Sequence, residues 1–409
     1  MCGIAGYISV PDRPSSVDLS ITIKQLNHRG PDDSGTIIYK QKNATTGLGH
    51  TRLSILDLSS LGHQPMEFEN YSIVYNGEIY NFKEIKTELL SLGHKFLSDS
   101  DTEVILHSFK EWGIKSVSKF IGMFAFVIFD KIENKITIVR DRAGVKPLYY
   151  YWNNDLFMFS SELKTFDKHP KFEKKLDISS VHQYMDFGYV PSPYCIFEKC
   201  HKLQSGHILN FNINTKQIKL IKYWDVTDYY KMDKLDISYD DAKVELESLL
   251  KSACEYRMVS DVPVGVFLSG GYDSSLVSAI LAKKAGYKIN SYSIGFEDRS
   301  YNEADHAKKV ANYLGLNHTE KICTEKNAID LIEKLVDVYD EPFGDSSAIP
   351  TLLVSELASK DVKVVLSADG GDEIFGGYSK YSTSINAYKK INSIPNFVLK
   401  LLHASPESL

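Results

Sequence analysis

Cysteine directly follows the initiator methionine in the opening stretch "MCGIAGYISV". Once Met1 is removed, Cys2 carries a thiol and a free α-amine on one residue. A free thiol titrates near about 8.5 and an α-amine near about 7.7–8.0, so the amine can accept the thiol proton at little cost at neutral pH. The position therefore predicts a nucleophile with its own base, and a chemically inert early cysteine is the alternative.

A second candidate site lies in "VGVFLSGGYDSSLV", where an apolar strand leads through two glycines into a helix start that bears Ser274 and Ser275. Glycines let backbone N–H groups turn toward an anion, and a helix N-terminus adds partial positive charge. The motif GxxxxGK[ST] is absent, and Asp273 indicates instead a magnesium ion between carboxylate and phosphate. The pattern predicts a pyrophosphate-binding loop, with a tight turn that binds nothing as the alternative.

A third stretch, "VVLSADGGDEIFGGY", again follows an apolar strand and places Asp369, Asp372 and Glu373 among glycines. Acidic groups at the end of a neighbouring parallel strand can share the same magnesium ion and polarise a phosphoanhydride. An exposed acidic turn is the alternative for this stretch alone. Two such loops at strand ends favour a nucleotide site.

The composition is that of a globular protein with a small soluble substrate. The chain has 409 residues, of which 43% are hydrophobic, enough for two or three domains with sizeable cores. Its 47 basic and 53 acidic residues give a net charge of -6 without blocks of like charge, which argues against nucleic-acid and membrane partners. The longest apolar run, "MFAFVIF", is far shorter than the roughly 20 residues of a membrane helix. No secretory leader is recognised, so a cytoplasmic location is expected.

Five cysteines without a CxxC motif fit neither a disulfide framework nor a zinc site and indicate a reducing compartment. Apart from Cys2 they are interpreted as structural. The histidines near the candidate motifs show no metal-ligand spacing and receive no role; they are His28, His50 and His63.

The elements that must position these residues change in kind along the chain. Runs such as "YSIVYNGEIYN", "MFAFVIFD" and "KITIVRDR" predict antiparallel strands in the first half, with a helix at "TEVILHSFKEWG". The segment "SYDDAKVELESLLKSACEYRM" predicts a helix capped by Ser238 and Asp241. Beyond it strands and helices alternate, which predicts a parallel sheet with ligands at the carboxyl ends of its strands. We expect domains at 2–215 and 235–409.

The stretch "LSGGYDSS" resembles the SGGxDS signature of the PP-loop ATP pyrophosphatases. With "DEPFGDSSAIPT" and "LSADGGDEIFGGY", it resembles the synthetase domain of glutamine-hydrolysing asparagine synthetases, which has a doubly wound parallel sheet. The resemblance implies cleavage of ATP to AMP and pyrophosphate with Mg²⁺ and activation of a carboxylate as an acyl-adenylate. The residues it implies are Leu268, Ser269, Gly270, Gly271, Asp273 and Ser274 at the phosphates, Ile294 at the adenine, Ser367 and Ala368 beside the ATP, Asp369 in catalysis, and Asp273 and Asp372 as magnesium ligands. The family usually has glycine at the position of Ala368, where a positive φ would be strained.

The motifs "NHRGPDDSG", "VYNGEIYNF" and "RDRAGVKPLYY" resemble the N-terminal-nucleophile (Ntn) glutamine amidotransferase domain of the same enzymes, an αββα sandwich. The resemblance implies that the cysteine attacks the glutamine amide, forms a γ-glutamyl thioester and releases ammonia. It implies the following roles: Cys2 as nucleophile, Arg52 on the glutamine carboxylate, Glu78 and Asp101 on its ammonium, and Asn76 and Gly77 as oxyanion hole. Local alternatives are a hairpin turn at "YNG", a helix cap at Asp101 and a surface charge at Arg52.

Joined, the halves predict glutamine-dependent asparagine synthesis from aspartate and ATP, with Mg²⁺ as cofactor and only small molecules as partners; a homodimer is left open. One alternative is an amidotransferase that amidates another carboxylate, such as a sugar acid or a peptide. Another is a non-catalytic interaction protein, which would be expected to have lost Cys2 or Asp273. Family members continue into a "DRxSMAxxLExRxPF"-type segment that follows a catalytic lysine, so a chain ending at "LLHASPESL" is expected to be shortened in its synthetase half.

Overall fold

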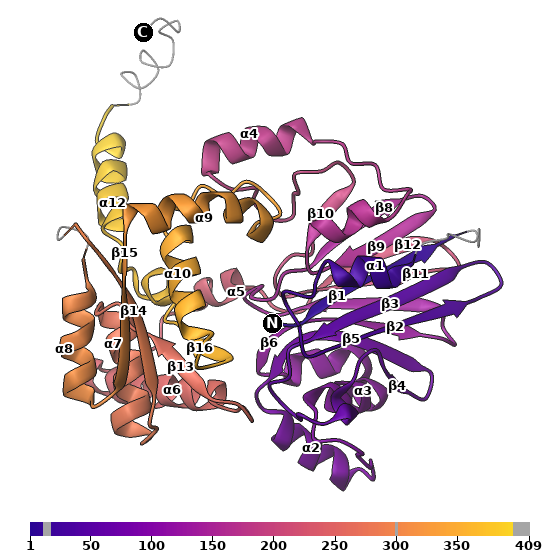
Figure 1. Ribbon diagram of the computed structural model, residues 1–409, viewed down its shortest axis with the longest axis horizontal. Helices are drawn as coiled ribbons and strands as arrows, with labels where there is room; N and C mark the ends of the chain where they lie inside the picture. The colour runs from indigo at the N-terminus through magenta and orange to yellow at the C-terminus, as the bar shows by residue number, and fades with distance from the viewer. Residues whose placement is uncertain (11–17, 299–301, 396–409) are drawn as a thin grey trace, which may run out of the picture. The chain divides into compact units, whose positions relative to one another are not determined.

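The computed structural model describes residues 1–10, 18–298 and 302–395 (Figure 1). The chain divides into two compact units, one of Met1–Val264 with Cys323–Val364 and the other of Gly265–Ile322 with Val365–Leu409. The first unit is therefore built from two separate stretches of the chain. The division at 215 and 235 stays a prediction, and residues 401–409, on which the expectation of a shortened chain depends, lie outside the described residues.

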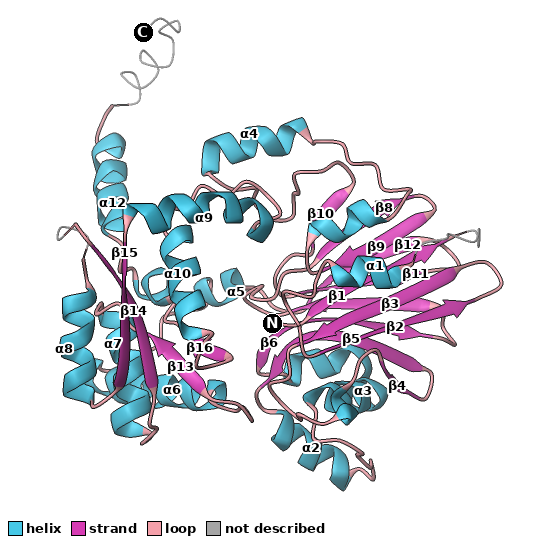
Figure 2. Cartoon of the chain, viewed as in Figure 1, coloured by secondary structure: helices cyan, strands magenta, loops and turns pink. Residues whose placement is uncertain are grey.

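Two six-stranded antiparallel sheets form the centre of the first unit, as the strand arrows of Figure 2 show. In spatial order, the first sheet consists of β10 (Cys200–Lys202), β8 (Tyr149–Asn153), β9 (Leu156–Ser160), β1 (Gly3–Ser9), β3 (Thr45–Arg52) and β2 (Asp33–Lys40). The second consists of β12 (Gln217–Lys222), β11 (His207–Asn212), β7 (Lys135–Arg140), β6 (Gly122–Asp130), β5 (Tyr71–Ile79) and β4 (Met66–Phe68).

Alternation along the strands makes these sheets into a sandwich. Ile4 and Ile8 of β1 belong to the same buried cluster as Val74 of β5 and Val127 of β6, so one face of each sheet lines a shared core. Tyr7 packs in a separate cluster on the other face of the first sheet. Buried clusters thus lie on both faces of the first sheet, whereas the edge strands β2 and β12 alternate with exposed residues.

Helices form the outer layers of the sandwich. The helix α1 (Leu19–Lys24) packs on the first sheet, while α2 (Phe82–Ser91) and α3 (Asp101–Trp112) pack on the second (Figure 1). Ser100 caps α3 by accepting a hydrogen bond from the Thr102 amide. The predicted αββα sandwich and the helix at "TEVILHSFKEWG" are confirmed.

One further α-helix of the first unit, α4 (Ile178–Phe187), lies between β9 and β10 in the chain. Those that follow β12 in the described residues are α5 (Val226–Tyr230), α6 (Tyr239–Arg257), α9 (Glu325–Val338) and α10 (Ala348–Ala358). At the start of α6, Ser238 Oγ accepts from the Asp241 amide and donates to its carboxylate, as the predicted capping pair requires.

A four-stranded parallel sheet carries the second candidate site. Its spatial order is β15 (Asn317–Cys323), β14 (Asn290–Phe296), β13 (Val264–Phe267) and β16 (Val364–Leu366). The helices α7 (Tyr272–Ala279), α8 (Ala304–Leu314), α11 (Gly371–Phe375) and α12 (Ser379–Asn392) accompany it in the chain. Ala307 and Ala311 of α8 pack on Leu268 just after β13, and their small side chains let the helix approach closely. Within the described residues, no helix has both the length and the apolar character needed to cross a bilayer.

Substitution Phe211→Ala tests the shared core of the sandwich. Phe211 is fully buried and stacks on Phe157 with 4.6 Å between ring centroids. Truncation leaves a cavity between the sheets, so we expect a loss of about 3–5 kcal/mol in the free energy of unfolding. Urea unfolding followed by circular dichroism measures this loss. Phe187→Ala, at a ring that is 61% exposed, is the control, and equal midpoints for the two variants would contradict the assignment of the core.

Candidate active sites

Strand pairing places Cys2 at the end of a central strand. β1 lies between β9 and β3, and Gly3 pairs with Thr51, so Cys2 emerges beside Arg52 and Leu53. The Leu53 amide donates a hydrogen bond to Cys2 Sγ at 3.4 Å. Burial raises the pKa of the Cys2 thiol, and the contact with the Leu53 backbone opposes that rise. The thiol therefore needs a base to become a nucleophile.

The base expected from the sequence requires removal of Met1. With Met1 present, the nitrogen of Cys2 belongs to a peptide bond and the α-amine belongs to Met1. Burial lowers the pKa of that amine to about 5, so it is neutral at physiological pH. The α-amine of Cys2 forms only when Met1 is removed, so its role as the base stays a prediction.

A narrow pocket beside Cys2 gathers residues from four segments of the first unit. Four of the predicted glutamine-binding residues line it together with Cys2: Arg52, Gly77, Glu78 and Asp101. The other lining residues are Leu53, Ile55, Leu56, Gly62, Gln64, Tyr75, Ser100 and Thr102. Residues that are far apart in sequence therefore surround one thiol.

Asn76 is buried in β5, and both polar atoms of its side-chain amide lack a hydrogen-bond partner within the described part of the chain. A buried amide without partners is rare because it forfeits its hydration, and a ligand oxygen would satisfy it. Asn76 and Gly77 lie inside the strand, where Asn76 pairs with Ala125, so the hairpin-turn alternative is wrong. Asn76 is not among the residues that line the pocket beside Cys2, so its part in an oxyanion hole stays a prediction.

Two buried carboxylates make the pocket strongly acidic. Burial, followed by the negative charge of Asp101, raises the pKa of Glu78 well above its usual value. Burial also raises the pKa of Asp101 to about 6, although hydrogen bonds from the Ile79 amide and the Tyr75 hydroxyl oppose the rise. Ser100, rather than Asp101, supplies the helix cap. An ammonium group would relieve the repulsion between these carboxylates.

Arg52 is 6% exposed and is not a surface charge. Its guanidinium donates to the backbone carbonyls of Ser59 and Leu56 at 2.8 and 3.2 Å, and also to Asp57. A Cβ at Gly62 would lie 1.9 Å from Nη2, so only glycine leaves room for this arrangement. These three bonds use part of the five-donor fork, and the other donors can serve a carboxylate in the pocket.

Sequence reasoning missed two residues that support this pocket. The Gln64 side chain accepts from the Tyr75 amide at 2.7 Å and donates to Thr102 Oγ1 at 3.1 Å, which joins β5 to α3. His50 is fully buried with its Nε2 3.0 Å from the Tyr75 carbonyl oxygen, and burial lowers its pKa to about 3. No local pattern could have found them, because their partners are distant in sequence.

The phosphate loop of the second unit runs from Leu268 to Gly271 between β13 and α7, and Ser274 follows in the first turn of α7. Gly270 has φ of 85°, a conformation that favours glycine. A Cβ at this position would also lie 2.6 Å from the Ala307 amide nitrogen, so steric contact is a second reason for glycine. Ser274 Oγ accepts a hydrogen bond from the Ser269 amide, and the two hydroxyls lie 3.0 Å apart. The loop thus presents small polar groups and backbone at a helix N-terminus, which fits a phosphate chain.

The acidic loop after β16 approaches the phosphate loop. A Cβ added to Gly371 would lie 2.3 Å from Asp273 Oδ2, so the backbone of one loop packs on the carboxylate of the other. Ser367 Oγ donates to Asp369 at 2.7 Å. Gly370, with φ of 94°, adopts the left-handed backbone conformation in this loop. Ala368 does not have a positive φ, so the backbone strain that a non-glycine residue could cause at this position does not arise.

Of the other residues predicted here, Ile294 lies half-buried on β14 and Asp372 lies in α11. Within residues 1–10, 18–298 and 302–395, no cluster of three or more acidic, histidine or cysteine side chains could hold a metal ion by itself. Asp273 and Asp372 are oxygen donors of the type that Mg²⁺ prefers, and phosphate oxygens usually complete such a site. The residues present therefore fit a magnesium ion that arrives with a nucleotide.

Family models cover most of the chain. Residues 1–224 match the model of a glutamine amidotransferase domain, and residues 245–408 match that of asparagine synthase. The fold and the two sites thus define a glutamine amidotransferase joined to a synthase domain of the kind that uses ATP. A putative glutamine-hydrolysing asparagine synthetase 2 of Methanocaldococcus jannaschii is 42% identical over 97% of this chain and 79% of its own length. The chain belongs to the glutamine-hydrolysing asparagine synthetase family.

Other relatives show how far the similarity reaches. The glutamine-hydrolysing asparagine synthetase 1 of Bacillus subtilis is 35% identical over 98% of this chain and 62% of its own length. The amidase chry2 of Gibberella zeae is 30% identical over 93% of this chain and 60% of its own length. The chain thus spans only about three fifths of the length of these two relatives.

The acidic pocket predicts a pH dependence of glutamine binding. Lowering the pH protonates Asp101, whose pKa is about 6, and Glu78, whose pKa burial raises well above its usual value, so the attraction for the ammonium group is lost. We expect the Kd for glutamine to rise by about tenfold per pH unit below pH 6. Calorimetry on a Cys2→Ala variant, which cannot turn glutamine over, measures it. Asp101→Asn should weaken binding at pH 8 and flatten the acid side, and a Kd independent of pH between 5 and 8 in the parent would contradict this electrostatic role.

Proposed function

We propose that the chain catalyses glutamine-dependent asparagine synthesis. The observation that carries this proposal is the pocket that brings Arg52, Glu78 and Asp101 together beside Cys2. One cationic fork, two carboxylates and a thiol match the carboxylate, ammonium and side-chain amide of free glutamine, and no other common amino acid presents all three groups at that length. Membership of the family supports the same reaction.

In the first unit, Cys2 attacks the side-chain carbonyl carbon of glutamine after Met1 is removed. The α-amine takes the thiol proton and returns it to the departing nitrogen, so ammonia leaves and a γ-glutamyl thioester remains. The Asn76 side chain and the Gly77 N–H stabilise the oxyanion of the tetrahedral intermediate. Water then hydrolyses the thioester to glutamate and restores the thiol.

In the second unit, the phosphate loop binds ATP and the aspartate carboxylate attacks its α-phosphorus. Pyrophosphate leaves, and ammonia displaces AMP from the aspartyl-adenylate to give asparagine. Asp273 and Asp372 would hold a magnesium ion, which neutralises charge on the leaving pyrophosphate when bound. The backbone of residues 268–271 orients the phosphates, Ile294 lies against the adenine, and Asp369 serves the substrate.

The carboxylate that accepts the ammonia is proposed to be that of aspartate. The similarity to amidase chry2 keeps a second acceptor class in view, namely a carboxylate other than that of aspartate. Pyrophosphate release with MgATP, ammonium and a panel of carboxylates, with glutamine omitted, tests the acceptor independently of Cys2. Release that depends on aspartate supports asparagine synthesis, whereas release that depends on a sugar acid or peptide carboxylate supports the second class. A non-catalytic interaction protein would release none.

Replacing the nucleophile should separate the two half-reactions. Cys2→Ala removes the attacking atom, so we expect glutamine hydrolysis to fall by about 10⁴-fold or more while reaction with added ammonium is retained. Glutamate production and pyrophosphate release are assayed in parallel. Cys254→Ala, which removes a buried thiol that does not line the pocket beside Cys2, should leave both rates unchanged. Equal loss of both reactions in Cys2→Ala would refute the division of labour.

Asp273→Ala should impair the ATP-dependent reaction and leave glutamine hydrolysis intact. Removing a magnesium ligand at the phosphate loop is expected to reduce pyrophosphate release by about a hundredfold, because several kcal/mol of charge stabilisation are lost. Glutamine hydrolysis without ATP should remain at the parent rate. Asp305→Ala removes an exposed acid from the first turn of α8 in the same unit and is the matched control. A parent rate of pyrophosphate release in Asp273→Ala would contradict the metal-binding role.

A further inference from the structure

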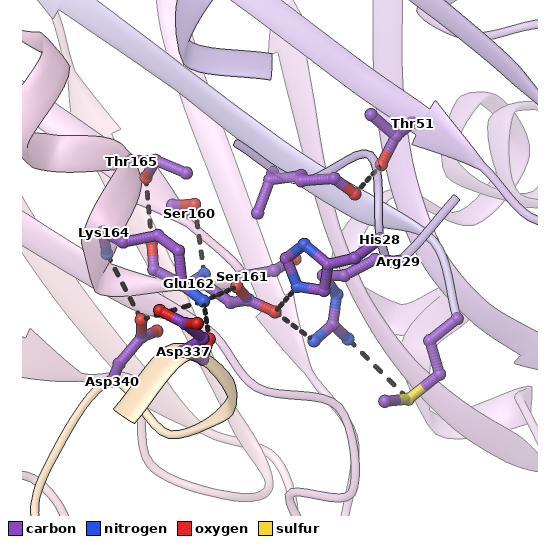
Figure 3. Close-up of polar contacts among 12 residues, drawn as sticks. His28, Arg29, Thr51, Ser160, Ser161, Glu162, Lys164, Thr165, Asp337 and Asp340 are labelled. Carbon is purple, nitrogen blue, oxygen red and sulfur yellow. Dashed lines mark hydrogen bonds and ion pairs between the residues drawn. The ribbon is translucent and has the colours of Figure 1, made fainter. Parts of the chain in front are cut away.

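Glu162 lies buried just after β9 and interacts with three basic side chains, those of His28, Arg29 and Lys164 (Figure 3). Arg29 Nη1 donates to its Oε1 at 2.8 Å, and His28 Nε2 lies 2.9 Å from the same oxygen. Lys164 Nζ forms an ion pair with Oε2 at 3.0 Å. Burial opposes ionisation of Glu162, but the hydrogen bonds from His28 and Arg29 outweigh it and lower the pKa to about 2. The Glu162 carboxyl group is thus ionised at physiological pH.

Arg29 connects this anion to the candidate nucleophile. Its Nε donates to the backbone carbonyl oxygen of Cys2 at 2.9 Å, while the adjacent Nη1 holds Glu162. Because the guanidinium is planar and rigid, fixing one of its edges on a carboxylate fixes the direction of the other donor. The side chains of Arg29 and Glu162 are each only 8% exposed, so water does not compete freely for these bonds. The orientation of the Cys2 peptide therefore depends on a carboxylate 160 residues away.

Asp340 fixes the backbone that carries Glu162. Its carboxylate accepts from the Leu163 amide at 2.6 Å and from the Lys164 amide at 3.4 Å. Lys164 Nζ in turn donates to the Asp337 carbonyl, as the lower part of Figure 3 shows. The next residue, Glu341, accepts from the Ile196 amide at 2.7 Å. The turn 337–341 lies in the stretch that matches asparagine synthase, yet it belongs to the first compact unit.

We propose that Glu162 is a positioning residue for Cys2 that acts through Arg29, and that Asp340 holds Glu162 in place, so that the turn 337–341 sets the efficiency of the thiol. The inference rests on the proposed glutaminase function of Cys2. The proposal explains why a carboxylate is kept in a buried place that an apolar residue could fill. An isolated buried ion pair can often be replaced by apolar residues without loss of stability. Replacing an ion pair that also holds a reacting residue would cost catalytic efficiency.

The binding pocket and the positioning network use different residues. Arg52, Glu78 and Asp101 line the pocket beside Cys2, and Glu162 and Arg29 do not belong to that lining. A fault in the network should therefore misplace the thiol without removing any group that binds glutamine. Misplacement of a reacting atom by about 1 Å reduces rates by about 10²-fold. The signature is a loss in kcat with little change in KM.

The test uses Glu162→Gln in the full chain, with Asp130→Asn as matched control. Asp130 is also a carboxylate that is 6% exposed, and it accepts hydrogen bonds from Asn70 and the amides of Ile132 and Glu133, away from Cys2. We expect kcat for glutamine hydrolysis to fall at least tenfold in Glu162→Gln, with KM within about twofold of the parent. Asp130→Asn should keep the parent kcat. A parent kcat in Glu162→Gln, or equal losses in both variants, would overturn the proposal.

Alkylation of Cys2 gives a readout that does not depend on turnover. Iodoacetamide modification, with the Cys2 peptide quantified by mass spectrometry across pH 6–9, should show a changed rate and pH profile in Glu162→Gln and the parent profile in Asp130→Asn. An unchanged profile together with an unchanged kcat refutes positioning by Glu162. If the parent chain does not hydrolyse glutamine, the proposed function fails, and the alkylation profiles still decide whether Glu162 positions the thiol.

A double-mutant cycle tests the part played by Asp340. We expect Asp340→Asn to lower kcat severalfold in the parent and to have little further effect in Glu162→Gln, because both changes loosen the same support. Multiplicative effects of the two substitutions would show that Asp340 acts independently of Glu162 and would overturn this part of the proposal. KM for glutamine serves as the internal control in all four proteins.

Discussion

The central position of β1 is the constraint on which the first site depends. Because β1 is paired on both sides, by β9 and β3, the first residues of the chain are held along the whole length of the strand. Ile4 and Ile8 face the sandwich core, so a slip of one residue would expose them and bury the wrong face. The register that protects the core therefore also delivers Cys2 to one point beside Arg52. An N-terminal residue, normally among the least ordered in a protein, becomes a fixed reactive group.

Buried carboxylates distinguish the two kinds of support around that thiol. Burial raises the pKa values of Glu78 and Asp101, and the charge of Asp101 adds to the rise at Glu78, so an ammonium group beside them would be favoured. Glu162 has Arg29 and Lys164 as ion-pair partners and a lowered pKa. The same chemical group therefore has opposite pKa shifts according to whether basic side chains contact it.

Local patterns in the sequence were sufficient for several of the elements and for the motifs. Runs of β-branched and aromatic residues predicted strands of the sandwich, Ser238 and Asp241 predicted a capped helix, and the glycine pairs predicted the loops after β13 and β16. What could not be predicted depends on pairs that meet only in the folded chain. Glu162 has no local signature, since its partner Arg29 lies 133 residues away, and nothing in the stretch 323–364 indicated that it would belong to the first unit. The roles of the site residues, unlike their positions, remain predictions.

The two candidate sites consequently respond to substitution in different ways. The pocket at Cys2 depends on polar networks that span long stretches of sequence, so single changes such as those at Glu162 act through intermediaries and leave the backbone in place. The phosphate loop depends on backbone proximity, because Gly270 and Gly371 each stand where a Cβ would clash with a neighbouring loop or helix. A Cβ at Gly270 would meet the backbone of α8, and one at Gly371 would meet the carboxylate of Asp273. Short motifs therefore identify the second site and the lining of the first, whereas the residues that support the first, such as Gln64 and Glu162, are found only in the folded chain.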